Sequence, residues 1–242
     1  MELLCGGIIL GNKMRFFSII IGILFPLIIL ITAIETASFD KTFFMNQVKD
    51  NNVVKNTGIA ETDMESVVTE ILAYLQGTRS NFDIQARITV KGITSDIPVS
   101  IFNEQEMVHM NDVKALLNQA LTLRNIAMIF FLITLVYLLK NNQMALIKGL
   151  FYGSAIALVF ILLIGVIFTV NFDGAFTLFH QLFFLNDLWL MNPETDLLIW
   201  IVPGPFFFNL IERMVLYAVI PLALTGIGTG ILLFKKRKLK IN

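Results

Sequence analysis

Four long apolar stretches limit what this chain can fold into more than any other feature of its sequence. A membrane-spanning helix needs about 20 mostly apolar residues, and residues 126–139 alone are too short for one, so the second stretch must begin near residue 116. The predicted spans are residues 16–36, 116–139, 147–170 and 214–234. Only 15% of the residues are charged, against about a quarter in a soluble domain. We therefore predict a mostly α membrane protein with four transmembrane helices.

Basic residues give the predicted orientation. They precede the first span, bracket the turn at residues 140–146 and fill the tail at residues 235–242. Positive charge in short flanking segments marks the cytoplasmic side. We expect a multi-pass cell-membrane protein with residues 1–15 and the tail in the cytoplasm, and with the loops at residues 37–115 and 171–213 outside. The only cysteine, Cys5, excludes an internal disulfide and a cysteine-based zinc site.

The loop at residues 37–115 is predicted to be a small α+β extracytoplasmic domain. In "TDMESVVTEILAYLQG", Thr62 and Glu65 have the spacing of a helix capping box, and Gly77 suits the helix end. "DIQARITVKGITSDIPVSIF" predicts two strands with a turn near Gly92. Asn103 is predicted to cap a second helix, again with a carboxylate, Glu106, three residues on. This helix carries His109 and continues into the second span.

The loop at residues 171–213 is too apolar for a solvated connection. A helix from 174 to 190 is predicted at the bilayer surface, anchored by Phe176, Phe179, Phe183 and Trp189. On it, His180 and Asp187 would lie two turns apart on one face. The Pro-Gly-Pro at residues 203–205 cannot sit inside a continuous helix. We therefore expect an aromatic, interfacial or re-entrant loop between the third and fourth spans.

The only two histidines, His109 and His180, both fall outside the membrane by this topology. Each has a carboxylate within helical reach: Glu106 and Asp112 for His109, and Asp187 for His180. No HExxH or GxSxG motif is present, and "YGSA" around Ser154 lies in a span. What remains is general acid–base chemistry by histidine, although an interfacial histidine is also commonly a packing residue. Three ligands with metal spacing are not evident, so we expect no metal and no cofactor.

Two motifs, "FNEQEMVHMNDVK" and "FHQLFFLNDLWLMNPETDLLI", together with the four spans, resemble the lipoprotein intramolecular transacylase family of Gram-positive bacteria. The resemblance covers the chain from Met14 on. It implies transfer of the sn-2 acyl chain of an S-diacylglyceryl cysteine to the α-amino group of the same cysteine, which gives a lyso-form lipoprotein. It places His109 and His180 as catalytic residues, with the supporting or oxyanion positions at Asp112, Asn186, Asp187 and Asp196.

The expected partners are a diacylated lipoprotein in the outer leaflet and membrane lipids, with no nucleic acid. The reacting amine belongs to the substrate, so no acyl-enzyme is needed. A non-catalytic membrane accessory or lipid-binding protein with an extracytoplasmic docking domain is the alternative. A small transporter is a third class, but the spans have no internal repeats and no charges in mid-bilayer.

Overall fold

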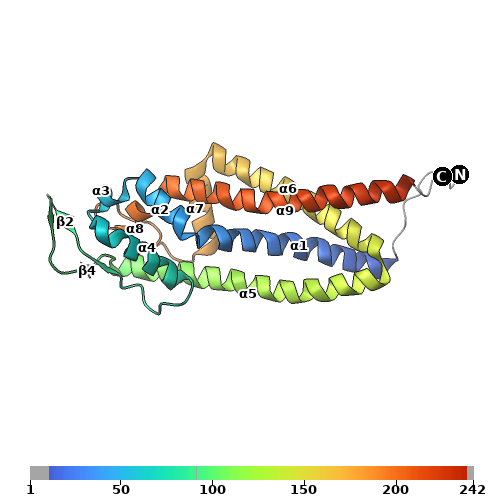
Figure 1. The fold of residues 1–242 in the computed structure, drawn as a ribbon, viewed down its shortest axis with the longest axis horizontal. Coiled ribbons are helices and arrows are strands. Elements are labelled where there is room, and N and C mark those ends of the chain that lie inside the picture. The colour runs from blue at the N-terminus through green and yellow to red at the C-terminus, as the bar shows by residue number, and fades with distance from the viewer. Residues whose placement is uncertain (1–10, 91, 239–242) are drawn as a thin grey trace. The chain divides into compact units, whose positions relative to one another are not determined.

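The computed structural model describes residues 11–90 and 92–238. Cys5 and the end of the predicted basic tail lie outside these residues. The helices and strands are α1 (Asn12–Ser38), α2 (Lys41–Asp50), α3 (Val53–Thr57), α4 (Glu61–Leu75), β1 (Gln85–Ala86), β2 (Thr89–Val90), β3 (Ile93–Thr94), β4 (Val99–Ser100), α5 (Glu104–Asn141), α6 (Gln143–Val170), α7 (Phe172–Phe183), α8 (Leu198–Ile201) and α9 (Gly204–Lys238) (Figure 1).

The chain divides into two compact units. Among the described residues, the first unit, called the four-helix unit, is made of residues 11–33, 122–164 and 215–238. The second, called the mixed unit, is made of residues 34–121 and 165–214. Each of the four long helices contributes to both units.

Four helices, α1, α5, α6 and α9, are long and apolar enough to cross a membrane. Each contains one predicted span, so the predicted fold class is confirmed. The helices also extend beyond the predicted spans. With 38 residues α5 is about 57 Å long, much more than the roughly 30 Å hydrocarbon core, and its first 18 residues belong to the mixed unit. The exact span boundaries remain predictions.

Close helix packing in the four-helix unit comes from glycines of α1 and α6. A Cβ atom added to Gly153 would lie 2.2 Å from the carbonyl oxygen of Gly22, so only glycine fits there. Nearby, the buried Ser18 hydroxyl donates to the Ala145 carbonyl oxygen at 2.8 Å. The glycines of α9 have more room, and Gly228 has no atom within 4 Å of its added Cβ.

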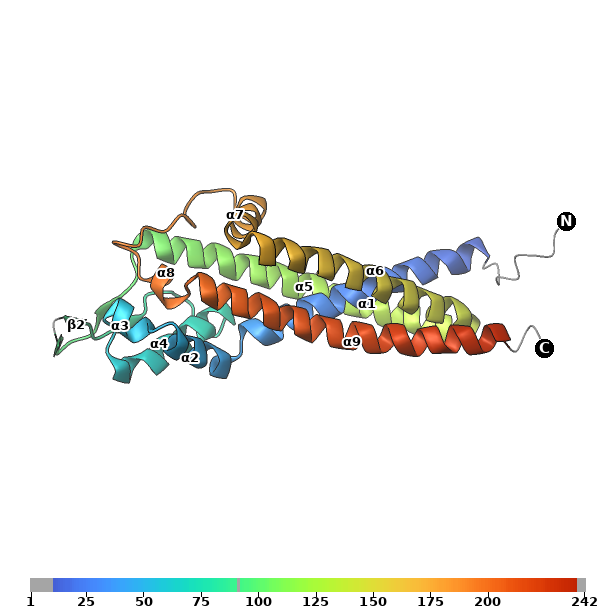
Figure 2. The ribbon, with the colours of Figure 1, turned by 90° about the horizontal axis from the view of Figure 1, so that it is seen from above.

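The mixed unit contains α2, α3 and α4, the short strands, and the irregular segment after α7 (Figure 2). Strands β2 and β3 form an antiparallel hairpin, and β1 pairs antiparallel with β4. Gly92 has a φ of +81°, which confirms the predicted turn, because this left-handed conformation favours glycine. The apolar face of α4 is buried, as its sequence pattern predicts, and includes Val68, Ile71 and Leu72.

The predicted capping box at Thr62 is wrong. Helix α4 begins at Glu61, after Ala60, whose N–H donates to the Arg87 carbonyl oxygen at 2.8 Å. Thr62 instead accepts a hydrogen bond from the Arg87 guanidinium at 3.0 Å, and Glu65 pairs with Lys41. Pairing of the preceding segment with residues 87–88 fixes the start of the helix, and no local sequence pattern contains that information.

The predicted interfacial helix ends earlier than expected. Helix α7 stops at Phe183, and Phe184 has an extended backbone with φ −118° and ψ 134°. The Asn186 side chain then accepts from the Leu188 N–H at 3.1 Å, a local turn that competes with helix formation. Asp187 therefore does not share a helix face with His180, and that prediction is wrong.

The predicted break at the Pro-Gly-Pro sequence is present. Helix α8 ends at Ile201 and α9 starts at Gly204. Pro205 lies in the first turn of α9, where its missing N–H leaves no helical hydrogen bond unmade. The last long helix thus begins ten residues before the predicted span at 214.

Candidate active site

His109 and His180 lie together in the mixed unit, although they are 71 residues apart in the sequence. His109 is on α5, one turn after the helix start, and His180 is near the end of α7. Their ring centroids are 6.1 Å apart with a tilt of 31°. Both residues are buried, with 7% of their surface exposed. The structure therefore brings together the two residues that the sequence singles out.

Aromatic rings surround the two histidines. The His180 ring lies 4.1 Å from the Phe176 centroid and 4.9 Å from the Trp189 centroid. Phe184 is shared, with its centroid 5.4 Å from His180 and 5.2 Å from His109. This apolar environment disfavours a charged imidazole.

The electrostatics follow from this burial. Burial, and to a smaller extent the proximity of His180, lower the pKa of His109 to about 4, although Asp112 works in the opposite direction. Burial also lowers the pKa of His180, although the hydrogen bond to Phe176 opposes the change. Both imidazoles are therefore neutral at pH 7, which is the form that can accept a proton.

The tautomer of His180 follows from its hydrogen bond. Nδ1 of His180 lies 2.7 Å from the Phe176 carbonyl oxygen, which can only accept. Nδ1 must therefore carry the hydrogen, and Nε2 keeps its lone pair. In His109, Nδ1 is buried without a hydrogen-bond partner among the described residues. Buried polar atoms are normally paired, so this nitrogen is a candidate contact for a substrate.

Asp112 and Asn186 form one supporting pair beside the histidines. Asp112 is one helical turn beyond His109 on α5, and the Asn186 side-chain amide donates to its carboxylate at 2.9 Å. Asp187 does not take part in the hydrogen bond between Asp112 and Asn186. It is exposed, and its carboxylate has no hydrogen bond with any residue that the structure describes.

Asp196 lies in a second supporting group, with Asn103 and Glu106. Its carboxylate accepts from the Thr195 hydroxyl, the Asn192 N–H and the Asn103 side-chain amide. Burial raises the pKa of Asp196, but these three hydrogen bonds outweigh it and lower the pKa overall. An ionised carboxylate only accepts hydrogen bonds, so Asp196 has no hydrogen to donate to an oxyanion.

The sequence places Glu106 within helical reach of His109, but in the structure its carboxylate binds backbone N–H groups. It is completely buried, and its carboxylate accepts from the N–H of Asn103 at 2.7 Å and from the N–H of Leu198 at 2.6 Å. The spacing of Asn103 and Glu106 did predict a capped helix start, which the reciprocal bond from the Glu106 N–H to Asn103 Oδ1 confirms. The contact with Leu198, 92 residues away, has no local sequence pattern.

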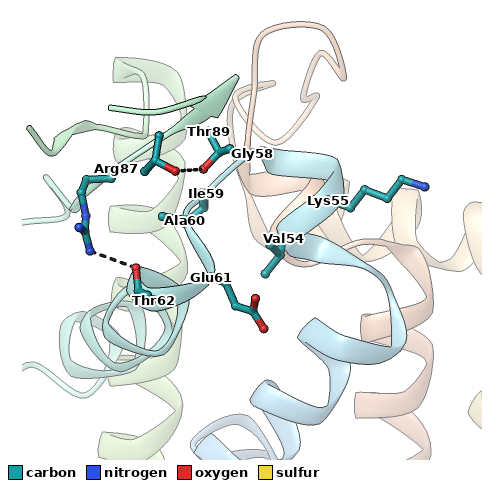
Figure 3. Close-up of a pocket in the computed structure, with 10 residues that line it drawn as sticks. Val54, Lys55, Gly58, Ile59, Ala60, Glu61, Thr62, Arg87 and Thr89 are labelled. Atoms are coloured by element: carbon teal, nitrogen blue, oxygen red, sulfur yellow. Dashed lines mark hydrogen bonds between the residues drawn. The ribbon is translucent and has the colours of Figure 1, made fainter. Parts of the chain in front are cut away.

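A separate groove of about 640 Å³ lies elsewhere in the mixed unit, among Lys55, Gly58, Glu61, Arg87 and Thr89 (Figure 3). Neither histidine lines it. Within residues 11–90 and 92–238, no three histidine, cysteine or acidic side chains are grouped so that they could hold a metal ion. The two histidines of the described site can transfer protons and form hydrogen bonds with their own ring nitrogens.

Comparison with known proteins identifies the family. The family model described as lipoprotein intramolecular transacylase Lit matches residues 19–207. The in meso structure of the membrane integral lipoprotein intramolecular transacylase Lit from Bacillus cereus matches 95% of this chain and 100% of that chain, with 21% identity and a TM-score of 0.76. Structures of the Bacillus cereus protein with one histidine replaced by arginine or by alanine each cover 94% of this chain, at 21% identity and a TM-score of 0.71.

At this identity the solved structures show a shared fold, and no curated protein sequence matches the chain. The family model covers most of the chain, including both histidines and the loop between α7 and α8. This integral membrane protein therefore belongs to the lipoprotein intramolecular transacylase family.

Proposed function

We propose that this protein moves the sn-2 acyl chain of an S-diacylglyceryl cysteine lipoprotein to the α-amino group of the same cysteine. The product is an N-acyl, S-monoacylglyceryl lipoprotein. The observation that carries the proposal is the pair of buried, neutral histidines, His109 and His180, inside an aromatic environment. Such an environment suits acyl chains, while the imidazoles supply the proton transfers.

The reaction needs one bond to form and one to break. The amine nitrogen attacks the ester carbonyl carbon, a proton leaves the nitrogen, and the bond to the sn-2 oxygen breaks as that oxygen gains a proton. His180 Nε2, with its free lone pair, is the proposed base for the amine. His109 is the proposed hydrogen-bond donor to the oxyanion, and the proton that His180 takes from the amine is the one proposed to pass to the leaving oxygen. Each role is worth roughly 10²–10⁴-fold in rate.

The remaining catalysis comes from holding the substrate. The amine and the ester belong to one molecule, and attack closes a medium-sized ring. Holding two reacting groups in the attacking geometry supplies roughly 7–11 kcal/mol in the best cases. No acyl-enzyme is formed, because the nucleophile is the substrate's own amine, and ester-to-amide transfer is redox-neutral, so it needs no cofactor.

The proposed orientation puts the mixed unit on the extracytoplasmic side and both termini in the cytoplasm, in keeping with the positions of the basic residues. In a Cys5→Ser background, single cysteines replacing Ser80 or Glu194 should react with an impermeant thiol reagent in whole cells. A cysteine at Asn141, the last residue of α5, should react only after lysis. The reverse pattern would put both histidines in the cytoplasm and contradict an outer-leaflet substrate.

An isotope experiment tests the reaction itself. Purified protein is given a synthetic diacylglyceryl-cysteine lipopeptide that carries a heavy-isotope label in the sn-2 chain only. Mass spectrometry should find the label in an amide on the cysteine nitrogen and an unacylated hydroxyl at sn-2. An N-acetylated lipopeptide should give no transfer. A label that remains in an ester, or that appears as free fatty acid, would contradict the proposal.

A further inference from the structure

A buried carboxylate joins α5 to the loop that covers the two histidines. Glu106 lies one helical turn before His109, and none of its surface is exposed. One carboxylate oxygen, Oε2, accepts from Asn103 and completes the helix cap. The other, Oε1, accepts from the Leu198 N–H at 2.6 Å, at the start of α8. A single side chain therefore serves both the helix start and the end of the loop at residues 184–197.

Other side chains near the start of α5 hold the same loop. Asn103 donates its side-chain amide to the buried Asp196 carboxylate at 2.8 Å, and that carboxylate in turn accepts from the Asn192 N–H. Gln105 donates to the carbonyl oxygens of Leu188 and Leu190 at 3.1 and 3.0 Å. The loop is thus fastened to α5 at several points, of which Glu106 is the most buried.

The loop at residues 184–197 carries side chains that contact the two histidines and Asp112. Phe184 contacts both histidine rings, and the ring centroids of Trp189 and His180 are 4.9 Å apart. Asn186 holds Asp112, one turn beyond His109. A loop that moved away would remove part of the aromatic cover and leave the histidines exposed to water.

Helix capping alone does not account for a carboxylate in this place. The cap uses only Oε2, which accepts from the Asn103 N–H. Removing a charge from water is costly unless it is well paired, and burial raises the pKa of Glu106 in spite of the hydrogen bonds from Asn103 and Leu198. A carboxylate can accept at both oxygens, whereas glutamine would direct an N–H group at one of the two N–H donors.

We propose that Glu106 is a positioning residue for the acyl transfer: it fastens the loop at residues 184–197 to α5 and so keeps the aromatic cover closed over His109 and His180. The inference rests on the proposed function. Glu106 does not contact the histidine rings in this role, and it acts through the loop. Misplacement of about 1 Å at an active site can cost roughly 10²-fold in rate.

Two measurements on Glu106→Gln test the inference. The first is kcat and KM for the labelled lipopeptide. The second is hydrogen–deuterium exchange of peptides covering residues 184–201, which reports on the loop without reference to product. Glu65→Gln is the matched control, because it removes only a surface ion pair with Lys41 on the same unit. Asp196→Asn, which weakens the second attachment, provides an independent variant if Glu106→Gln does not accumulate.

We expect Glu106→Gln to lower kcat by about 10²-fold, with a smaller change in KM and faster exchange in the loop. Asp196→Asn should also lower kcat and speed exchange in the loop. Glu65→Gln should keep both kcat and the exchange rate within twofold of wild type. Wild-type exchange in the variants, or faster exchange with kcat within threefold of wild type, would overturn the inference. An inactive wild-type protein would instead refute the proposed function, while the exchange data would still decide whether Glu106 holds the loop.

Discussion

His109 should make the protein less stable as the pH falls below about 6.5. Burial and the neighbouring His180 lower the pKa of His109 from 6.5 to about 4. A folded state that resists protonation is favoured above the unfolded pKa and loses that advantage as the pH falls toward the folded pKa. A pKa shift of this size contributes about 3 kcal/mol to the free energy of unfolding, and about 2 kcal/mol of that contribution is lost by pH 5.

The assay is thermal unfolding in detergent between pH 7.5 and 4.5 at a fixed scan rate. For a chain of this size, 3 kcal/mol corresponds to roughly 6–12 °C in Tm. The lowered pKa of His180 also makes the protein less stable as the pH falls. The raised pKa of Glu106 has the opposite effect, because its contribution to stability is lost as the pH rises. The comparison with His109→Gln isolates the His109 contribution, because glutamine does not titrate and the Tm of the variant should therefore fall less on acidification. Parallel Tm curves for the two proteins would refute the reasoning.

Three further outcomes are expected. Activity should survive chelators, because proton transfer by His109 and His180 needs no metal; loss on chelation with recovery on adding Zn²⁺ would make the two histidines metal ligands. Gly153→Val should reduce accumulation in the membrane, because its Cβ would lie 2.2 Å from the Gly22 carbonyl oxygen, and wild-type levels would show that α1 and α6 can separate at no cost. Phe183→Leu should lower turnover only a few-fold, because Phe183 is exposed and packs on Phe179; a loss as large as that of a histidine variant would give it a direct role.

Features that depend on local sequence could be predicted. The four spans follow from apolar length, the hairpin turn follows from Gly92, and the start of α5 follows from the spacing of Asn103 and Glu106. In each case the residues that determine the structure lie within one element or one turn. The two histidines could be selected because the chain has no others, and because the family resemblance covers both motifs.

Features that depend on distant residues could not be predicted. The spacing of Thr62 and Glu65 predicts a helix cap, but pairing with the segment at Arg87 places the start of α4 at Glu61. Helix α7 was expected to continue to residue 190, but Phe184 turns in to pack against His109, a residue of another helix. The second oxygen of Glu106 binds a backbone N–H 92 residues away. Tertiary contacts override local propensity at each of these positions.

The most direct test of the two-histidine site is the rate of labelled acyl transfer by His109→Ala, His180→Ala and the double variant, each checked for membrane accumulation. Residues that act as a unit are non-additive, so each single variant should lose most of the activity and the double variant should be little worse than either. Near-wild-type transfer by either single variant would make that histidine structural and contradict the site described above.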